Sequence, residues 1–194
     1  MKRIIGLTGG IGTGKTTVSN YLEHHHKLPV LDADIYAREA VKQGSAILTQ
    51  IVQRYGSDLQ HPDGTLNRQR LGEIIFSNPD ERQWVEQQIH PYVRDRFQSQ
   101  LDTLAAPTIV FVIPLLFEAN MTDLVTEIWV VRCSLQQQLD RMKKRDRLSL
   151  QQAQARIDSQ FPISEKVARA NVVLDNSSTI ETLLKQVDFA LLNR

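Results

Sequence analysis

Residues Gly9 to Thr16 combine residue types and spacing that could bind the phosphates of a nucleotide. They read Gly-Gly-Ile-Gly-Thr-Gly-Lys-Thr and fit the pattern G-x-x-x-x-G-K-[S/T]. Glycines let successive backbone N–H groups converge on one phosphate, and the N-terminus of a following helix adds partial positive charge. Lys15 would reach the β- and γ-phosphates, and the Thr16 hydroxyl would bind Mg²⁺. The nucleotide-binding residues that this pattern predicts are Gly10, Ile11, Gly12, Thr13, Gly14, Lys15, Thr16 and Thr17.

The segments on either side of this loop are those that a phosphate-binding loop requires. Arg3–Thr8 has the apolar pattern of a strand, and Thr16–Glu23 has the pattern of a helix. The alternative interpretation is a glycine-rich turn that only joins a strand to a helix. The complete pattern in this context favours phosphate binding.

Motifs elsewhere in the chain indicate which class of phosphate-loop protein this is. A regulatory GTPase would contain D-x-x-G and N-K-x-D, but no Asp stands three positions before a glycine and no Asn precedes Lys. A transport or remodelling ATPase would end its third strand in an acidic residue that holds Mg²⁺. The third predicted strand, Thr108–Ile113, runs instead into Pro114-Leu115-Leu116. The absence of these motifs argues against a regulatory GTPase and against a motor ATPase.

Two aspartates, Asp32 and Asp34, follow the second predicted strand, Pro29–Asp32. Ligands of open α/β sheets bind beyond the carboxyl ends of strands, and residues two apart on an extended chain point to one side. One carboxylate could orient and deprotonate a hydroxyl while the other holds the waters of Mg²⁺. Alternatively, one of them only caps a helix predicted over Ile35–Lys42. A base at this position favours a kinase that acts on a small-molecule hydroxyl over a hydrolase.

A third group of candidate residues is basic and spans Arg141 to Arg147. Arg141 and Arg145 are four residues apart and share one face of a helix. A cationic face on a mobile helical pair could close over a triphosphate and stabilise the phosphoryl group in transfer. The alternative is a solvated helix end whose basic residues favour the helix dipole.

Short Val- and Ile-rich runs alternate with longer helical patterns, which predicts an α/β fold around a parallel sheet. Asn78-Pro79 predicts a helix start, and Ser134-Leu-Gln-Gln and Ser149-Leu-Gln-Gln fit the capping box. Residues 41–104 show no strand pattern and predict a helical insertion after the second strand. The five predicted strands are Arg3–Thr8, Pro29–Asp32, Thr108–Ile113, Ile128–Arg132 and Val172–Asp175.

Composition limits the partners and the compartment of the protein. The 194 residues are 41% hydrophobic and 23% charged, which predicts one globular domain. The net charge of +1 gives no sequence-wide signal for binding to nucleic acid or to a membrane. The longest uncharged stretch, Ala105–Phe117, is too short to span a bilayer. A single cysteine, Cys133, excludes an intrachain disulfide and fits a reducing compartment, so we expect a cytoplasmic protein.

Taken together, these motifs resemble those of the dephospho-CoA kinase family over nearly the whole chain. The resemblance implies a P-loop kinase that transfers the γ-phosphoryl group of ATP, with Mg²⁺, to the ribose 3′-hydroxyl of dephospho-CoA in the final step of CoA biosynthesis. The segments that carry it are Leu7–Thr16, Asp32-Ala33-Asp34 with Ala37-Arg38, His90-Pro91, Pro114–Glu118, Arg141 with Arg145-Asp146, and Ala170–Asn176.

The same resemblance implies roles for particular residues. Asp34 would be the base, Arg141 or Arg145 the lid arginine, and Gly12 to Thr17 the residues that hold the ATP phosphates. The candidate metal ligands, from the loop pattern and the aspartate pair, are Thr16 and Asp32. The acceptor-binding residues would be Asp34, Arg38, His90, Leu115 and Glu118. It also implies a core of about residues 1–40, 105–134 and 160–194, a substrate-binding insertion of about 41–104 and a lid of about 135–159. Another kinase of the nucleoside-monophosphate type, or a nucleotide-binding regulator without turnover, is the alternative, and the oligomeric state stays open.

Overall fold

The computed structural model describes residues 2–193, and its internal contacts divide the chain into two compact units. The first unit combines the chain up to Asp32 with the chain from Ala105 onward. The second unit is continuous and comprises Ala33–Leu104. Among the described residues, none of the helices has the length and apolar character needed to cross a membrane.

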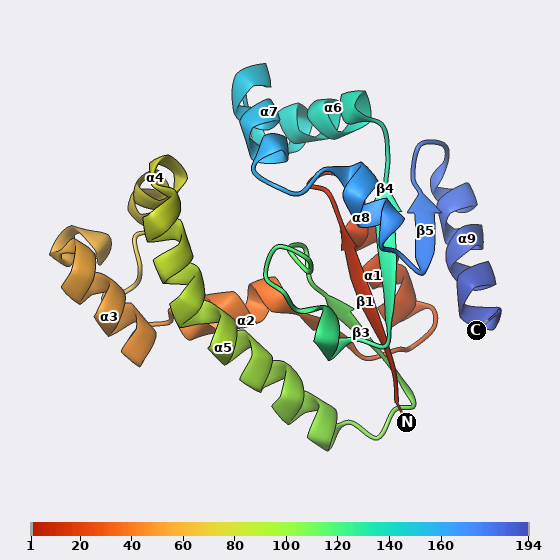
Figure 1. The fold of residues 1–194 in the computed structure, drawn as a ribbon, viewed down its shortest axis with the longest axis horizontal. Helices are drawn as coiled ribbons and strands as arrows, with labels where there is room; N and C mark the ends of the chain where they lie inside the picture. The colour runs from red at the N-terminus through yellow and green to blue at the C-terminus, as the bar shows by residue number, and fades with distance from the viewer. Residues whose placement is uncertain (1, 194) are drawn as a thin grey trace. The chain divides into compact units, whose positions relative to one another are not determined.

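The first unit contains a five-stranded sheet in which every neighbouring pair is parallel. The strand order is β2-β3-β1-β4-β5, so β1 lies at the centre (Figure 1). All five predicted strands are present, with ends that shift by at most one residue. This confirms the α/β fold with a parallel sheet. The strands are β1 (Arg3–Gly9), β2 (Val30–Asp32), β3 (Thr108–Val112), β4 (Glu127–Arg132) and β5 (Val172–Asp175).

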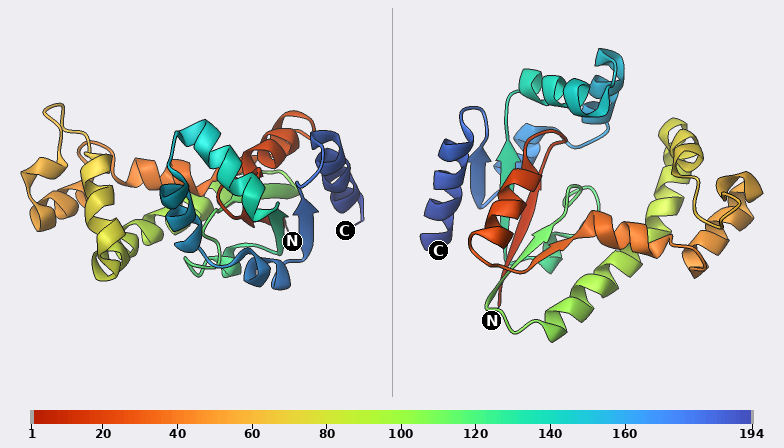
Figure 2. Two further views of the ribbon diagram at one scale, coloured as in Figure 1. Left: turned by 90° about the horizontal axis from the view of Figure 1, so that it is seen from above. Right: turned by 180° about the vertical axis from the view of Figure 1, so that it is seen from behind.

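Helices cover both faces of this sheet. The helices α1 and α9 pack on one face, where alternate strand residues such as Ile5, Leu7 and Trp129 form a buried core with Val18 and Leu183. Helix α8 lies against β4 on the opposite face (Figure 2). The helices of this unit are α1 (Lys15–His24), α6 (Leu135–Asp146), α7 (Leu150–Asp158), α8 (Ile163–Ala168) and α9 (Ile180–Leu192).

The helical pair α6–α7 begins where the capping boxes predict. Ser134 Oγ accepts from the Gln137 N–H at 3.3 Å, and Gln137 Oε1 accepts from the Ser134 N–H at 3.1 Å. Ser149 and Gln152 make the same reciprocal bonds before α7. Each box satisfies N–H groups that a helix leaves free at its start, and this fixes where the helix begins.

The second unit is a helical insertion between β2 and β3. Its helix α5 starts after Asn78, whose Oδ1 accepts from the Asp80 N–H at 3.0 Å, with Pro79 at the first position, as predicted. A small core of buried aliphatic residues, including Leu48, Ile51 and Leu59, holds the helices together. The helices are α2 (Ala33–Ala40), α3 (Ala46–Tyr55), α4 (Arg68–Ser77) and α5 (Pro79–Thr103), with a 3₁₀ turn at Ser57–Leu59.

Candidate active site

The phosphate loop joins β1 to α1 through backbone conformations that favour glycine. Gly9, Gly12 and Gly14 have φ values of 145°, 74° and 105°. Helix α1 begins at Lys15, and neither a capping side chain nor an acidic residue occupies its first turn. An anion can therefore approach the start of this helix, where the helix dipole adds positive charge.

The loop is also held in shape by its own side chains. Lys15 Nζ donates to the carbonyl oxygens of Gly9 and Gly10, each at 2.9 Å. The fully buried Thr13 hydroxyl donates to the Gly10 carbonyl at 2.8 Å. The lysine ammonium is thus already positioned at the loop, where it can act as a point charge toward a phosphate.

Two side chains from distant segments brace the loop from α6 and from the end of β5. Arg141 donates to the carbonyl oxygens of Gly12 at 3.1 Å and Thr13 at 3.2 Å. Buried Asn176 donates to the same Thr13 carbonyl at 2.8 Å and accepts from Arg141 through its own carbonyl at 3.1 Å. A side chain at Gly14 would collide with the Asn176 amide nitrogen. Sequence reasoning assigned Asn176 no role, although its place just after β5 at the carboxyl edge of the sheet was a usable signal.

The second candidate lid arginine has a different environment. Arg145 makes a two-pronged pair with its neighbour Asp146, at 2.7 and 2.8 Å, and its side chain is 64% exposed. The hydrogen bonds from Arg145 hold the pKa of Asp146 below its usual range. The structure therefore brings Arg141 to the phosphate loop and places Arg145 on the solvent-facing part of α6.

The helical pair α6–α7 and the phosphate loop are packed together through Ile11. Its side chain packs against the core of the pair, formed by Leu139, Met142 and Ala153. Its backbone N–H donates to Gln160 Oε1 at 2.9 Å, just after α7. A movement of the helical pair would therefore act directly on the loop.

Asp32 ends β2 at the same edge of the sheet, but not beside β1. In the strand register Asp32 is level with Val112 of β3, and Val112 is level with Leu7 of β1. Asp32 is therefore two strand spacings from β1, or about 10 Å. Strand β3 therefore separates this strand end from the strand that leads into the loop.

Asp34 is not on an extended chain, so the expectation that it shares one side with Asp32 was wrong. Helix α2 begins at Ala33, directly after β2, and Asp34 lies in its first turn. The helix predicted over Ile35–Lys42 thus starts two residues earlier. Helical geometry turns each residue by about 100° from the last, so a spacing of two no longer aligns the carboxylates.

The segment after β3 is fixed by a buried lysine. Lys166 of α8 is fully buried and pairs with Glu118 at 2.7 Å. Its ammonium also donates to the Pro114 carbonyl at 3.3 Å, which accepts the Thr8 hydroxyl at 3.1 Å. Glu118, expected to bind the acceptor, is therefore committed to an internal ion pair, while Leu115 is 36% exposed. No motif in the sequence singled out Lys166.

The second unit contains the other expected acceptor residues. Asp34 and Arg38 lie one turn apart on α2 and line a pocket of about 300 Å³ with apolar walls. Ile89 of α5 lines this pocket, whereas the next residue, His90, is half-buried outside its lining. Burial lowers the pKa of His90; Glu86 acts to raise this pKa, and Arg94 acts to lower it further.

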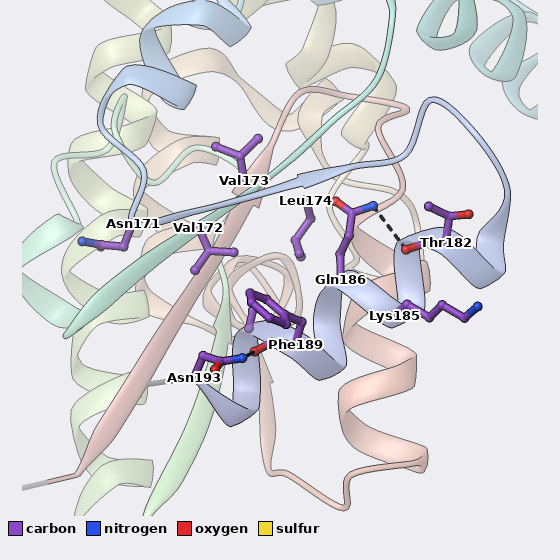
Figure 3. A pocket seen from close by; sticks show the side chains of 10 residues that line it. Asn171, Val172, Val173, Leu174, Thr182, Lys185, Gln186, Phe189 and Asn193 are labelled. Carbon is purple, nitrogen blue, oxygen red and sulfur yellow. Dashed lines mark hydrogen bonds between the residues drawn. The ribbon is translucent and has the colours of Figure 1, made fainter.

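A different groove of the first unit, of about 600 Å³, lies between β5 and α9. Figure 3 shows Val172 and Leu174 pointing toward α9, whereas Val173 points away. None of its lining residues belongs to the phosphate loop or to the candidate catalytic set. The site is therefore centred on the loop and not on this groove.

Residues 3–182 of the chain match the family model for dephospho-CoA kinase. A dephospho-CoA kinase of Trichormus variabilis is 63% identical over 190 residues, which cover 98% of this chain and 97% of that protein. A dephospho-CoA kinase of a Synechocystis species is 54% identical and covers 96% of this chain and 93% of its own.

Solved structures agree with this relationship. A crystal structure from Thermus thermophilus has a TM-score of 0.85 and 32% identity, covering 98% of this chain and 97% of that one. A dephospho-CoA kinase from Campylobacter jejuni has a TM-score of 0.72 and 26% identity, covering 99% of this chain and 96% of that one. A shikimate kinase from Aquifex aeolicus, at 14% identity and a TM-score of 0.55, shares the fold over 97% of this chain and 96% of its own. The phosphate loop, its bracing residues and the full-length matches together show that the chain belongs to the dephospho-CoA kinase family.

Proposed function

We propose that this protein transfers the γ-phosphoryl group of ATP to the ribose 3′-hydroxyl of dephospho-CoA, giving CoA and ADP in the cytoplasm. The observation that carries the proposal is the braced phosphate loop, with Lys15 held at it, in a chain that matches this kinase family over residues 3–182. Kinase chemistry of this kind depends mainly on positioning and on electrostatic stabilisation, because little covalent work is left to the protein.

The donor would be held by the loop. The N-terminus of α1 and the Lys15 ammonium would bind the phosphates, with residues 10–17 around them. As the bond between the γ-phosphorus and the bridging oxygen breaks, negative charge grows on the leaving ADP. Lys15 is placed to stabilise that charge.

The residues at the loop fit Mg²⁺, which prefers oxygen ligands and keeps several waters. Thr16 is exposed at the start of α1, and Asp32 ends β2 at the same sheet edge. We propose that the Thr16 hydroxyl binds the ion and that Asp32, which β3 separates from β1, holds water bound to it. The ion, when bound, neutralises charge on the phosphates. The described residues contain no cluster of three or more His, Cys, Asp and Glu side chains suited to a metal. The phosphates and water would therefore supply the remaining ligands.

Asp34 would act as the base for the acceptor. Its side chain is exposed at the start of α2 and lines the apolar-walled pocket with Arg38. As the 3′-oxygen forms its bond to the γ-phosphorus, the Asp34 carboxylate would take the hydroxyl proton. Asp32, half-buried at the end of a strand, is the better candidate for the metal.

We further propose that the helical pair of residues 135–159 acts as a lid and that the insertion of residues 41–104 binds the acceptor. The lid proposal is supported by Ile11, which ties the pair to the phosphate loop. Arg141 and Arg145, both on α6, would then respond to the nucleotide together. Closure of such an element excludes water and completes the site.

A panel of acceptors tests this function. The protein is incubated with ATP, Mg²⁺ and either dephospho-CoA, adenosine, AMP or no acceptor, and ADP is measured with Lys15→Ala as the blank. We expect ADP formation with dephospho-CoA at a kcat/KM well above that of the other acceptors. A preference for AMP would indicate a nucleoside-monophosphate kinase, and ADP formation that needs no acceptor would contradict the proposal. Binding of ATP without any turnover would indicate a regulator.

A further inference from the structure

The second unit contains a pocket of about 590 Å³ whose charged lining is entirely basic. Arg38, Lys42 and Arg68 line it together with His61, and its other lining residues are uncharged. We call it the cationic pocket. Three permanent positive charges around one concavity repel one another, and a bound anion relieves that repulsion.

The two arginines of the cationic pocket are left without protein partners. Within residues 2–193, the side chains of Arg38 and Arg68 make neither a hydrogen bond nor an ion pair. Three other arginines of the same unit are each paired with a carboxylate: Arg54 with Glu81 at 2.8 Å, Arg70 with Asp58 at 3.2 Å, and Arg96 with Glu39 at 3.1 Å. A guanidinium carries five donors in a planar fork that fits phosphate oxygens. The two forks that line the cationic pocket are therefore available to an anionic ligand.

The backbone around the cationic pocket is held in a fixed shape. The turn from His61 to Thr65 is closed by a hydrogen bond from the His61 N–H to the Thr65 carbonyl at 2.8 Å. Asp63, the acidic residue of this turn, accepts from the Thr65 N–H and hydroxyl at 2.9 and 2.6 Å. Buried Val41 and Leu66 form the floor. The positive charges are thus presented by a structured surface.

The cationic pocket adjoins the apolar-walled pocket that contains Asp34. Arg38, Val41, Leu66 and Arg68 line both of them. Asp34 and Arg38 are one helical turn apart, or about 6 Å along the axis. A ligand whose reacting hydroxyl meets Asp34 would therefore present its next charged group to the arginine pair.

We propose that Arg38 and Arg68, supported by Lys42, bind the diphosphate of the acceptor and so distinguish it from nucleosides that lack a diphosphate. This inference rests on the proposed function, in which Asp34 meets the 3′-hydroxyl of dephospho-CoA. The diphosphate lies on the 5′ side of that same ribose, and it is the charged group nearest to the reacting oxygen. Arg68 is thereby a specificity-determining residue of the second unit.

The test compares Arg68→Gln with a matched control. Arg82→Gln removes another exposed arginine of the same unit that lines neither pocket. Charge-assisted hydrogen bonds of this kind are strong, so we expect Arg68→Gln to raise the KM for dephospho-CoA at least about tenfold. The KM for ATP should stay unchanged, and Arg82→Gln should behave as wild type. With adenosine, which has the same hydroxyl but no phosphate, Arg68→Gln and wild type should have equal kcat/KM values.

Calorimetric titration with dephospho-CoA provides a reading that does not depend on turnover. We expect Arg68→Gln to weaken this binding by about the same factor, and to reduce its dependence on salt. Equal binding by wild type and Arg68→Gln, or an equal loss of activity with dephospho-CoA and adenosine, would overturn the inference. If wild type binds dephospho-CoA through Arg68 but never phosphorylates it, the proposed function fails and the binding site stands.

Discussion

Lys15 shows at the scale of a single residue how the phosphate loop is prepared for its ligand. The ammonium is already held by the carbonyl oxygens of Gly9 and Gly10, so its charge needs little rearrangement to meet a phosphate. Removing it in Lys15→Ala should lower turnover more than a hundredfold, since such electrostatic contributions are about 3–4 kcal/mol. Steady-state ADP formation measures this, with Lys185→Ala, at an exposed position of α9, as the control. Near-normal turnover in a folded Lys15→Ala would contradict the role of the loop.

The two aspartates should separate by role. Asp34→Asn keeps the size of the side chain but cannot accept a proton, so we expect kcat to fall by about 10²–10⁴-fold while ATP binding stays normal. Asp32→Asn should instead raise the Mg²⁺ concentration that half-saturates the enzyme.

Single-turnover transfer to dephospho-CoA, measured across Mg²⁺ titrations of both variants, distinguishes these outcomes. If Asp32→Asn were slow at every Mg²⁺ concentration and Asp34→Asn near normal, the two roles would be exchanged. Normal transfer by both variants would remove the pair from the chemistry.

At the scale of elements, the helix α6 holds two arginines with different environments. Arg141 donates to three carbonyl oxygens at and near the phosphate loop, so Arg141→Ala should lower the melting temperature and raise the KM for ATP. Arg145 is largely exposed and paired only with Asp146, so Arg145→Ala should leave the melting temperature within about a degree. If Arg145→Ala lowers kcat, Arg145 acts in the lid.

Thermal unfolding and ATP titrations of both variants provide the measurements. Equal loss of stability in the two would contradict the different environments that the structure gives them. Unchanged kinetics in both would indicate that α6 contributes only a solvated basic face.

An ion pair between α3 and α5 predicts a pH dependence of stability. Arg54 donates to both oxygens of Glu81, at 2.8 and 3.0 Å, and this holds the pKa of Glu81 below its usual range. Burial, reinforced by Glu81, raises the pKa of Tyr55 to about 12. Because the folded pKa of Glu81 is the lower one, its stabilisation is complete above the unfolded pKa of about 4.3 and is lost as the pH falls through the folded value.

We therefore expect Glu81→Gln to lower the urea midpoint at pH 7, and the difference from wild type to shrink as the pH falls below about 4. Unfolding curves at a series of pH values measure it. Glu73→Gln, also acidic but more exposed, should show a smaller difference at neutral pH. A difference that is constant down to pH 3 would contradict the role of the carboxylate.

At the scale of the whole molecule, sequence reasoning succeeded where the signal is local. The five strands follow from short Val- and Ile-rich runs, and the start of α6 follows from Ser134 and Gln137, which are three residues apart. The phosphate loop follows from one continuous segment. Each of these features depends on residues that are neighbours in the chain, so the pattern can be read without the fold.

The parts that sequence reasoning missed depend on partners brought together by the fold. Asn176 meets Thr13 across 163 positions, and Lys166 meets Pro114 across 52. The partner of either residue cannot be read from its neighbours in the chain, because an Asn after a strand and a Lys in a short helix are both common. The placement of Asp34 was wrong for a different reason: α2 begins without a loop after β2, so the extended geometry stops at Asp32.

The insertion of the second unit between β2 and β3 has a consequence for the order of folding. The second unit is one continuous stretch of helices, whereas the central strand β1 must pair with β3 across that whole stretch, with Arg3 opposite Thr108. Closing so long a loop carries an entropy cost, and non-local strand pairing is slow. On the ribosome, residues 33–104 emerge in full before β3 exists. We expect pulsed hydrogen exchange during refolding of the intact chain to protect amides of α3 and α5 before those of β1, and simultaneous protection would contradict this order.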